Sequence, residues 1–412
     1  VGSEMCIRDS GYTAKFKNNA AVLEVRLSIT VDANGLTMAA KAMASAAFET
    51  NRAGFTVLHP INGVAGCPVQ VHHSDGTNQK AQFPALIAPW QPFIDITALS
   101  HQAGGKLVTC QFQGDTFEME DQRQWGDASF KTYNRPLAKP WPYQLTPNAA
   151  LEQTVELTWQ NARQPAPLRR NPRAQDVLFP QMALVITADD ATRLANQPDD
   201  ITLVKPQRLL CHLDATLGAT KAQFQSFATA QKACPYVLYD LELICLCAEN
   251  PLPELQALAA QMHAGGFAPS SVLVCPSVDR QSTPPGSDWP PCPPLAQLHA
   301  AAAKAFPDMI RGGGMVSFFP ELNRKRPPVE ALDFISHGLC PIVHAADDLS
   351  VMETLEAVPH ITTSARAIIG KRPYRIGPAT IAMRQNPYGQ RTLPNPGQTR
   401  ICMADDDPVS YT

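Results

Sequence analysis

Residues 237–246 read VLYDLELICL, and residues 253–263 read PELQALAAQMH. The first segment is an almost continuous apolar run, which is typical of a strand buried on both faces of a parallel sheet. The second segment repeats apolar residues three and four positions apart, as on one face of a helix. A buried strand followed by an amphipathic helix is the building unit of a parallel α/β fold.

Similar pairs recur on both sides of this one: Ala183–Thr187 with Ala191–Ala195, Leu209–Leu213 with Lys221–Lys232, Ser271–Val274 with Leu295–Ala305, Ile310–Phe319 with Val329–Ile335, Pro341–His344 with Ser350–Ala357, and a last strand at Tyr374–Met383. About seven units over roughly 210 residues predict a TIM (β/α)8-like barrel. A doubly wound sheet is the alternative, but no GxGxxG motif follows the first strand.

The residues before this region alternate apolar and polar side chains with period two. Clear examples are Leu23–Ile29, Val69–His72, Lys106–Phe112 and Thr154–Trp159. Such alternation, punctuated by Gly and Pro, predicts an antiparallel β-sandwich. Residues 36–49 fit either a helix or a pair of strands.

These patterns predict an ordered series of segments. We expect a non-native or disordered leader at residues 1–18, a β-sandwich at 19–163, a linker at 164–174, a TIM barrel truncated in its last part at 175–403, and a tail at 404–412. The linker contains QPAPLRRNPR at residues 164–173, which has little apolar surface to bury. The opening VGSEMCIRDS lacks the basic and apolar regions of a signal peptide.

Composition excludes several classes of function. The chain has 34 Lys and Arg against 37 Asp and Glu, a net charge of -3, which argues against a nucleic-acid partner. No apolar run reaches the roughly 18 residues that span a membrane. The 11 cysteines form no CxxC pair, so we expect reduced thiols and a cytoplasmic protein, with Cys245 and Cys247 buried. Because GxSxG, P-loop and zinc-type spacings are absent, no cofactor or metal is expected. The oligomeric state stays open.

The first candidate site follows the strand at residues 315–320. Glu321, Asn323 and Arg324 would supply a base or nucleophile, a group that reads hydroxyls and an anion clamp. The alternative is a surface ion pair between Glu321 and Arg324.

A second cluster lies at residues 340–353, where His344 is predicted to close a strand beside Asp347 and Asp348. His344 is a candidate acid or base, while Asp348 or Ser350 would cap the next helix. Metal binding by His344, Asp347 and Glu353 is disfavoured, because no HxH or HExxH spacing occurs.

Glu242 is a carboxylate inside a strand that ought to be buried. Burying an unpaired charge is costly, so Glu242 needs either a structural Arg partner or a catalytic role. His212 and Asp214, at the end of the preceding strand, line the same pocket or merely cap a loop.

Charged and aromatic residues alternate at 114–133. We expect Glu118, Glu120, Asp121 and Arg123 to form mutual structural pairs in an interdomain network. A sugar-contacting surface that includes Trp125 and Tyr133 is the alternative.

Four segments together resemble the bacterial D-apionate lactonase family: FEMEDQRQWGDASFKTY (117–133), FFPELNRKRPP (318–328), PIVHAADDLSVMETLEAVP (341–359) and YRIGPATIAMRQNPYG (374–389). The resemblance extends from about Ala21 to Met403. It implies a β-rich N-terminal domain, a TIM barrel and a C-terminal β domain, with this chain lacking the start of the first and all of the last. It also implies hydrolysis of D-apionolactone to D-apionate in apiose catabolism.

Lactone opening requires an activated water, a stabilised oxyanion and a protonated leaving oxygen. We expect Glu321 to be the base, Glu242 or His344 the proton donor, and Arg324 or Arg384 the group that stabilises negative charge. Asn323, Asp348 and Asn386 are predicted to bind the sugar lactone. The alternatives are a glycoside hydrolase-like enzyme and a non-catalytic carbohydrate-binding protein.

Overall fold

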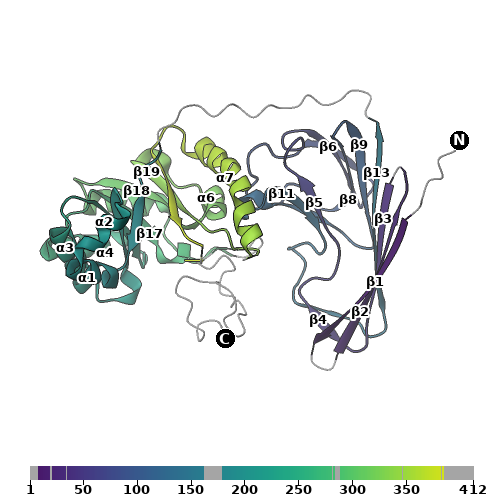
Figure 1. The fold of residues 1–412 in the computed structure, drawn as a ribbon, viewed down its shortest axis with the longest axis horizontal. Coiled ribbons are helices and arrows are strands. Elements are labelled where there is room, and N and C mark those ends of the chain that lie inside the picture. Colours follow the sequence, from purple (N-terminus) through teal and green to yellow (C-terminus); the bar gives the residue numbers. More distant parts are fainter. Residues whose placement is uncertain are drawn as a thin grey trace. The chain divides into compact units, whose positions relative to one another are not determined.

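The computed structural model describes residues 8–18, 21–33, 35–161, 179–280, 282–283, 288–345, 347–381 and 383–384. The chain divides into two compact units, one of antiparallel strands before residue 162 and one of alternating strands and helices after residue 178 (Figure 1). This confirms the predicted fold class. The predicted linker at 164–174 and the tail at 404–412 lie outside the described residues.

The first unit contains an eight-stranded antiparallel sheet. Its strands, in spatial order, are β1 (Arg8–Asn18), β2 (Ala21–Val31), β3 (Gly35–Ala44), β13 (Ala150–Asn161), β9 (Lys106–Gln113), β8 (Ile96–Ala103), β6 (Pro68–His73) and β7 (Asn78–Gln82). The four strands predicted from alternation all belong to it.

Two smaller antiparallel sheets complete this unit. One contains β10 (Glu118–Asp121), β11 (Ser129–Tyr133) and β5 (Thr56–Pro60), and the other contains β12 (Tyr143–Leu145) and β4 (Phe48–Thr50). A 3-10 helix, η1 (Gln122–Trp125), follows β10. Apolar residues of the large sheet, such as Val71 and Leu99, pack with Met119 and Phe130 of the three-stranded sheet in one core. This burial between sheets is what the period-two pattern predicts.

Two expectations for this unit are refined by the structure. Residues 8–18, assigned from sequence to a leader, form strand β1, which pairs with β2 along its whole length. Tyr12 and Phe16 of this edge strand are exposed, so its backbone hydrogen bonds rather than a buried face hold it in place. Residues 36–49, left open as a helix or two strands, contribute to strands β3 and β4.

The second unit contains seven parallel strands in sequential order, a nearly closed barrel. The strands are β14 (Ala183–Ile186), β15 (Arg208–Asp214), β16 (Leu238–Cys245), β17 (Ser271–Pro276), β18 (Ile310–Phe318), β19 (Phe334–Leu339) and β20 (Tyr374–Ala379). The helices are α1 (Ala188–Asn196), α2 (Ile201–Val204), α3 (Thr220–Ala233), α4 (Pro251–Gly265), α5 (Leu295–Ala305), α6 (Phe319–Lys325) and α7 (Asp348–Ile369). The 3-10 helices are η2 (Pro198–Asp200), η3 (Ala215–Leu217), η4 (Ser277–Arg280) and η5 (Val329–Ala331).

Two predicted elements near the end of the barrel are wrong. Residues 329–335 are not one helix, because a short 3-10 turn leads there into strand β19. Pro341–His344 is not a strand but part of the loop that follows β19. Strand β19 is short, and Ser336, His337 and Gly338 interrupt its apolar residues. Its sequence therefore shows no continuous apolar run that would predict a buried strand.

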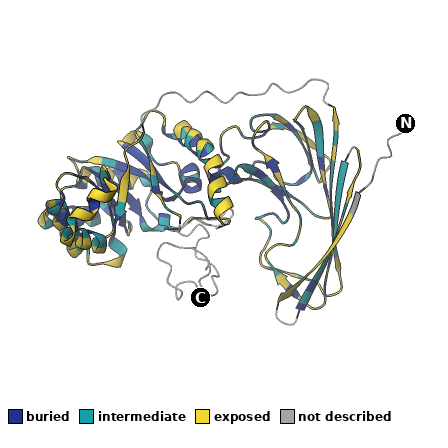
Figure 2. Cartoon of the chain, in the orientation of Figure 1, coloured by how far each residue is buried: buried dark blue, intermediate teal, exposed yellow. Residues whose placement is uncertain are grey.

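The central barrel strands β16, β17, β18 and β19 bury both of their faces (Figure 2), whereas the edge strands β14 and β20 are partly exposed. On β16, Leu241 and Leu243 pack with helix residues, whereas Ile244 packs with Phe334 of β19. Because β16 and β19 are not neighbours in the sheet, Ile244 and Phe334 meet inside the barrel. Asp240 and Glu242 alternate with the outward leucines and therefore point to the same interior. Within the described ranges, no helix has the length and apolar character needed to cross a membrane.

Candidate active site

Glu321 lies directly beyond a central strand of the barrel, as the sequence predicts. Strand β18 ends at Phe318, and Pro320, whose fixed φ suits a first helical turn, helps to start α6. The Glu321 side chain is fully buried at this carboxyl end of the strand. Catalytic residues of TIM barrels come from this end, so its position makes Glu321 a candidate catalytic group.

The Glu321 carboxyl group is incompletely satisfied. Its Oε1 accepts hydrogen bonds from the Thr283 backbone N–H at 3.1 Å and from Arg324 Nη1 at 3.3 Å. Its Oε2 is buried without a partner among the described residues. Burial raises the pKa of Glu321, although the positive charges of Arg324 and Lys325 act in the opposite direction. The raised pKa makes the ionised group a stronger base than an ordinary carboxylate.

A second buried carboxyl group, Asp279, lies at the end of the neighbouring strand β17. It forms an ion pair with Lys325, whose ammonium group lies 4.8 Å from the centre of the Trp289 ring. Burial raises the pKa of Asp279, and Lys325 opposes that shift. The negative charge of Asp279 in turn contributes to the raised pKa of Glu321, so the two groups are close enough to interact.

Buried polar atoms without partners among the described residues are concentrated in the segments at the carboxyl ends of β17 and β18. Such atoms occur on seven described side chains, and five of them belong to Asp279, Ser282, Thr283, Ser317 and Glu321. Buried polar groups are normally hydrogen-bonded, so a cluster of exceptions indicates a place for polar ligand atoms or water.

Asn323 and the side chain of Arg324, predicted beside Glu321, are buried on α6. Arg324 Nη1 donates to the Thr283 carbonyl at 3.2 Å as well as to Glu321, which places its positive charge at the carboxyl group. The Asn323 side-chain oxygen accepts from Arg326 Nη2 at 2.9 Å. This contact holds the amide in place.

Glu242 lies in the barrel interior rather than at the strand end. Its Oε1 accepts from His212 Nδ1 at 2.7 Å and from Arg384 Nη2 at 2.8 Å. Burial alone would raise the pKa of Glu242, but the Arg384 charge and the His212 hydrogen bond lower it to about 2. Glu242 is therefore ionised at neutral pH, which argues against the predicted role as proton donor and favours the Arg-paired alternative.

A second ion-pair layer lies closer to the amino ends of the strands. Asp240 accepts from Arg208 Nε at 2.6 Å and from Ser271 Oγ at 2.5 Å. Arg375 of β20 donates to Ser271 Oγ at 2.9 Å and lies 3.6 Å from Asp240. This layer is well paired and lies at the end of the barrel where stability rather than catalysis is expected. Asp214, farther along β15, caps a turn at Thr216 and pairs with Arg280.

The remaining predicted residues are exposed or lie outside the described residues. His344 is exposed in the loop after β19, and Asp348 is exposed in the first turn of α7. The helix cap is Asp347, which accepts from the Ser350 backbone N–H at 3.1 Å, and not Asp348 or Ser350 as predicted. Asn386 lies outside the described residues.

The glycines of β18 serve internal packing. A Cβ on Gly312 would lie 2.1 Å from the Phe334 ring, and one on Gly313 would lie 2.6 Å from His299. Gly314 has a φ of +124°, and a Cβ there would lie 2.0 Å from the Ser336 carbonyl oxygen.

Asp279 was not among the residues predicted from the sequence. It follows the predicted strand 271–274, just as Glu321 follows the predicted strand 310–319, and this position could have identified it.

Comparison with known proteins supports the two-unit division. Residues 7–162 match the family model of the N-terminal domain of D-apionate lactonase, and residues 182–410 match the model of its TIM barrel domain. The chain belongs to the D-apionate lactonase family. A protein of Brucella anthropi named D-apionate lactonase is 48% identical over 417 residues, covering 97% of this chain and 68% of that protein.

Solved structures resemble this chain only weakly. An apo β-glucuronidase from Ruminococcus gnavus covers 93% of this chain and 84% of its own, at 10% identity and a TM-score of 0.32. A crystal structure described as an aldose 1-epimerase from Escherichia coli K12 covers 39% of this chain and 69% of its own, at 12% identity and a TM-score of 0.26. Neither similarity carries an argument about function.

Proposed function

We propose that this chain hydrolyses a sugar-acid lactone, D-apionolactone to D-apionate, with Glu321 as the general base. Membership of the D-apionate lactonase family supports a hydrolase of carboxylic-ester bonds. The observation that carries the proposal is the buried, incompletely hydrogen-bonded Glu321 at the carboxyl end of β18. Glu321 combines the position, the raised pKa and the open oxygen that a base needs.

The proposed reaction uses groups around Glu321. Its carboxylate removes a proton from water, and the resulting hydroxide oxygen forms a bond to the lactone carbonyl carbon. The Arg324 guanidinium, already beside Glu321, stabilises the negative charge on the tetrahedral intermediate. When the ring C–O bond breaks, a proton must reach the leaving alkoxide.

Asp279 is the proposed proton donor, in place of Glu242 or His344. Its raised pKa favours the protonated form, and its Oδ2 has no partner among the described residues. Burial raises the pKa of both carboxyl groups, and the charge of Asp279 raises that of Glu321 further, so the two do not both ionise readily and one can hold the proton that the other lacks. The products of the cycle are the open hydroxy acid and an enzyme whose proton passes back from Glu321 to Asp279.

A substrate panel tests the proposed function. The purified chain is offered D-apionolactone, other five- and six-carbon aldonolactones and nitrophenyl glycosides, with acid release followed by titration and nitrophenol by absorbance. We expect acid release from the lactones above the spontaneous rate, fastest with D-apionolactone, and no nitrophenol. Nitrophenol release would favour the glycosidase alternative. Lactone binding without acid release would favour the binding protein.

A further inference from the structure

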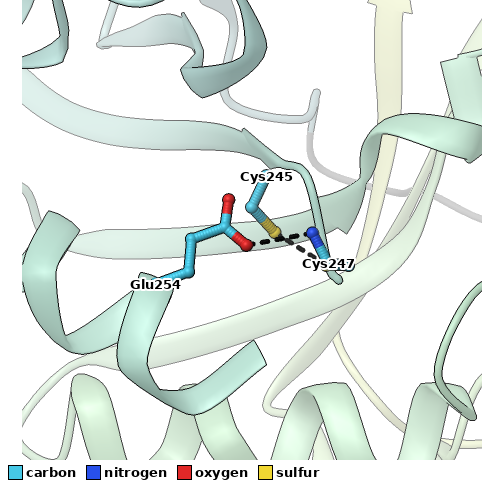
Figure 3. A group of neighbouring side chains, drawn as sticks. All are labelled: Cys245, Cys247 and Glu254. Atoms are coloured by element: carbon cyan, nitrogen blue, oxygen red, sulfur yellow. Dashed lines mark hydrogen bonds between the residues drawn. The ribbon is translucent and has the colours of Figure 1, made fainter. Parts of the chain in front are cut away.

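Two cysteines and a glutamate meet at the carboxyl end of β16. Cys245 is the last residue of this strand, and Cys247 follows with a φ of +52°, in the left-handed region. Glu254 lies in the first turn of the next helix, α4. Figure 3 shows the three side chains directed toward one another across the β16–α4 loop. Residues nine positions apart are thus brought together by a single connection.

The donor atoms of these residues form a compact group. The two Sγ atoms lie 3.0 Å apart, and the sulfurs and a Glu254 oxygen all lie within 4.8 Å of one another. Both cysteines are buried, which confirms the sequence prediction for them. Leu246 between them is 60% exposed, so solvent reaches the turn that carries the thiols.

The Glu254 carboxylate is held in a fixed orientation. Its Oε1 accepts from the Leu246 backbone N–H at 2.7 Å, and its Oε2 accepts from the Cys247 backbone N–H at 3.0 Å. Each oxygen keeps a further lone pair for another partner. Carboxylates that bind metals are commonly oriented by such hydrogen bonds.

We propose that Cys245, Cys247 and Glu254 form a binding site for one thiophilic divalent cation of the Zn²⁺ type. Zn²⁺ binds thiolates at about 2.3 Å and carboxylate oxygens at about 2.0–2.2 Å, usually with four ligands. Two sulfurs on a tetrahedral Zn²⁺ lie about 3.8 Å apart, so the thiols must separate by about 0.8 Å, which small side-chain rotations supply. Water fills the fourth position.

The carboxylate favours a cation over a disulfide at this pair. Disulfide formation requires a thiolate as nucleophile. Both thiols are buried, and the Glu254 carboxylate lies beside them, so this environment does not favour an additional uncompensated negative charge. A divalent cation changes this, because it replaces the protons of the two thiols. Its two positive charges then offset most of the negative charge of the two thiolates and the Glu254 carboxylate.

The site would fasten the β16–α4 loop at the same end of the barrel as Glu321, yet it contains none of the proposed catalytic residues. The inference therefore does not depend on lactone hydrolysis. Binding should release two protons for each cation and stabilise the folded chain in proportion to cation concentration.

Cd²⁺ and Co²⁺ are suitable probes, because a thiolate bound to either gives a charge-transfer band in the ultraviolet. The reduced wild-type chain is titrated with each metal against a competing chelator. We expect one cation per chain, the thiolate band and release of two protons. Cys245→Ser and Cys247→Ser should each weaken binding by more than about 100-fold, beyond the loss typical of changes outside the ligand set. Cys67→Ser, in the first unit, should bind like the wild type.

A measurement on the wild type keeps the test valid if a variant does not fold. Native mass spectrometry of the folded wild type should show one bound Cd²⁺ per chain that excess chelator removes. The proposal is overturned if no thiolate band appears, or if Cys67→Ser weakens binding as much as Cys245→Ser. It is also overturned if the air-exposed chain holds a Cys245–Cys247 disulfide and the reduced chain binds neither metal.

Discussion

Each unit contains a buried carboxylate beside an arginine, and the two pairs differ in how completely they are hydrogen-bonded. In the β unit, Arg123 Nε and Nη2 donate to the two Asp121 oxygens at 2.8 and 2.7 Å. In the barrel, Arg324 reaches one oxygen of Glu321 at 3.3 Å. All four side chains are 2% exposed or less, so burial does not distinguish them.

The Asp121–Arg123 pair is satisfied on both sides. Asp121 Oδ2 also accepts from the Ala88 backbone N–H at 3.0 Å, and the guanidinium donates to the carbonyl oxygens of Pro84, Ala85 and Leu86. A fork-shaped pair with every group occupied is suited to hold a loop in place. Its position in the three-stranded sheet supports the predicted structural role.

Other charges of the same segment find different partners from those predicted. Glu120 pairs with Lys131 at 2.6 Å, and Glu118 accepts from the Tyr133 hydroxyl at 2.5 Å. Mutual pairing within residues 118–123 is therefore correct only for Asp121 and Arg123. A buried ion pair whose hydrogen-bonding groups are all occupied, such as Asp121–Arg123, indicates a structural role. The unpartnered oxygen of Glu321 indicates a place where substrate or water can bind.

The largest expected effect is on turnover. Glu321→Gln removes the proposed base while keeping the side-chain shape, so kcat for lactone hydrolysis should fall by about 10²–10⁴, with little change in KM. Stability should change less than kcat, because burial already disfavours the Glu321 charge and Arg324 keeps its hydrogen bond to the Thr283 carbonyl. Initial rates of acid release and thermal melts measure both quantities.

Glu330→Gln is the matched control, since this carboxylate is 95% exposed in its pair with Arg372. It should retain wild-type kcat and KM. A raised KM with unchanged kcat in Glu321→Gln would make Glu321 a substrate-binding group instead. The unpartnered oxygen of Glu321 would then mark a substrate-binding position and not a general base.

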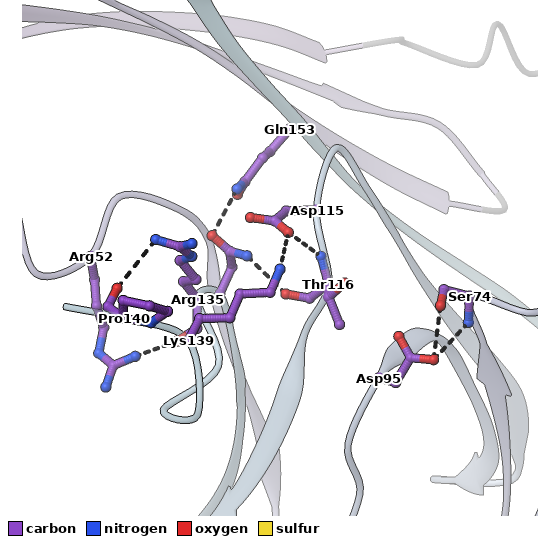
Figure 4. Close-up of polar contacts among 10 residues, drawn as sticks. Arg52, Ser74, Asp95, Asp115, Thr116, Arg135, Lys139, Pro140 and Gln153 are labelled. Carbon is purple, nitrogen blue, oxygen red and sulfur yellow. Dashed lines mark hydrogen bonds and ion pairs between the residues drawn. The ribbon is translucent and has the colours of Figure 1, made fainter. Parts of the chain in front are cut away.

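The second effect is on stability in the β unit. Asp121→Asn leaves the Arg123 charge buried without its counter-ion, and breaking one side of a buried pair typically costs about 3–5 kcal/mol. Asp115→Asn is the control, because Asp115 pairs with Lys139 at 2.9 Å on a partly exposed surface (Figure 4). Exposed pairs contribute about 0–1 kcal/mol. Equal losses of unfolding free energy in the two variants would contradict the structural role of Asp121.

Much of the fold was predictable because burial leaves a periodic pattern. Strands such as β16 and β17 are continuous apolar runs, and α5 matches its predicted range of residues 295–305. Strand β19 was missed because it carries polar and small residues that bond to the neighbouring strand β20: Ser336 Oγ donates to the Gly377 carbonyl and His337 contacts the Tyr374 hydroxyl. Contacts between distant residues leave no local pattern.

The candidate site was predictable only in part, for the same reason. Glu321 was predictable from its place after an apolar strand. Its proximity to Asp279 depends on the pairing of β17 with β18, and the ion pair of Glu242 with Arg384 joins positions 142 residues apart, so neither leaves a local pattern in the sequence. The Cys245–Cys247–Glu254 group depends on one left-handed residue, which a C-x-C spacing does not predict.

The smallest expected effect concerns the pH dependence of stability, where Glu242 and Glu321 should have opposite signs. The pKa of Glu242 falls from 4.5 to about 2 on folding, so its stabilising contribution is present above pH 4.5 and is lost as the pH falls toward 2. A shift of this size corresponds to about 3 kcal/mol. Glu242→Gln should therefore lower the free energy of unfolding near pH 7 and have a smaller effect near pH 3.

For Glu321 the pKa is raised on folding, so protonation stabilises the native state below pH 4.5 and this benefit is lost as the pH rises through the folded pKa. Glu321→Gln, which resembles the protonated form at every pH, should then remove this loss of stability between acid and neutral pH. Urea unfolding of both variants between about pH 3 and 7 measures the two slopes. If both substitutions change the pH dependence in the same direction, the pKa values of the two carboxyl groups are not shifted in opposite directions as the structure indicates. The raised pKa would then no longer support Glu321 as the base.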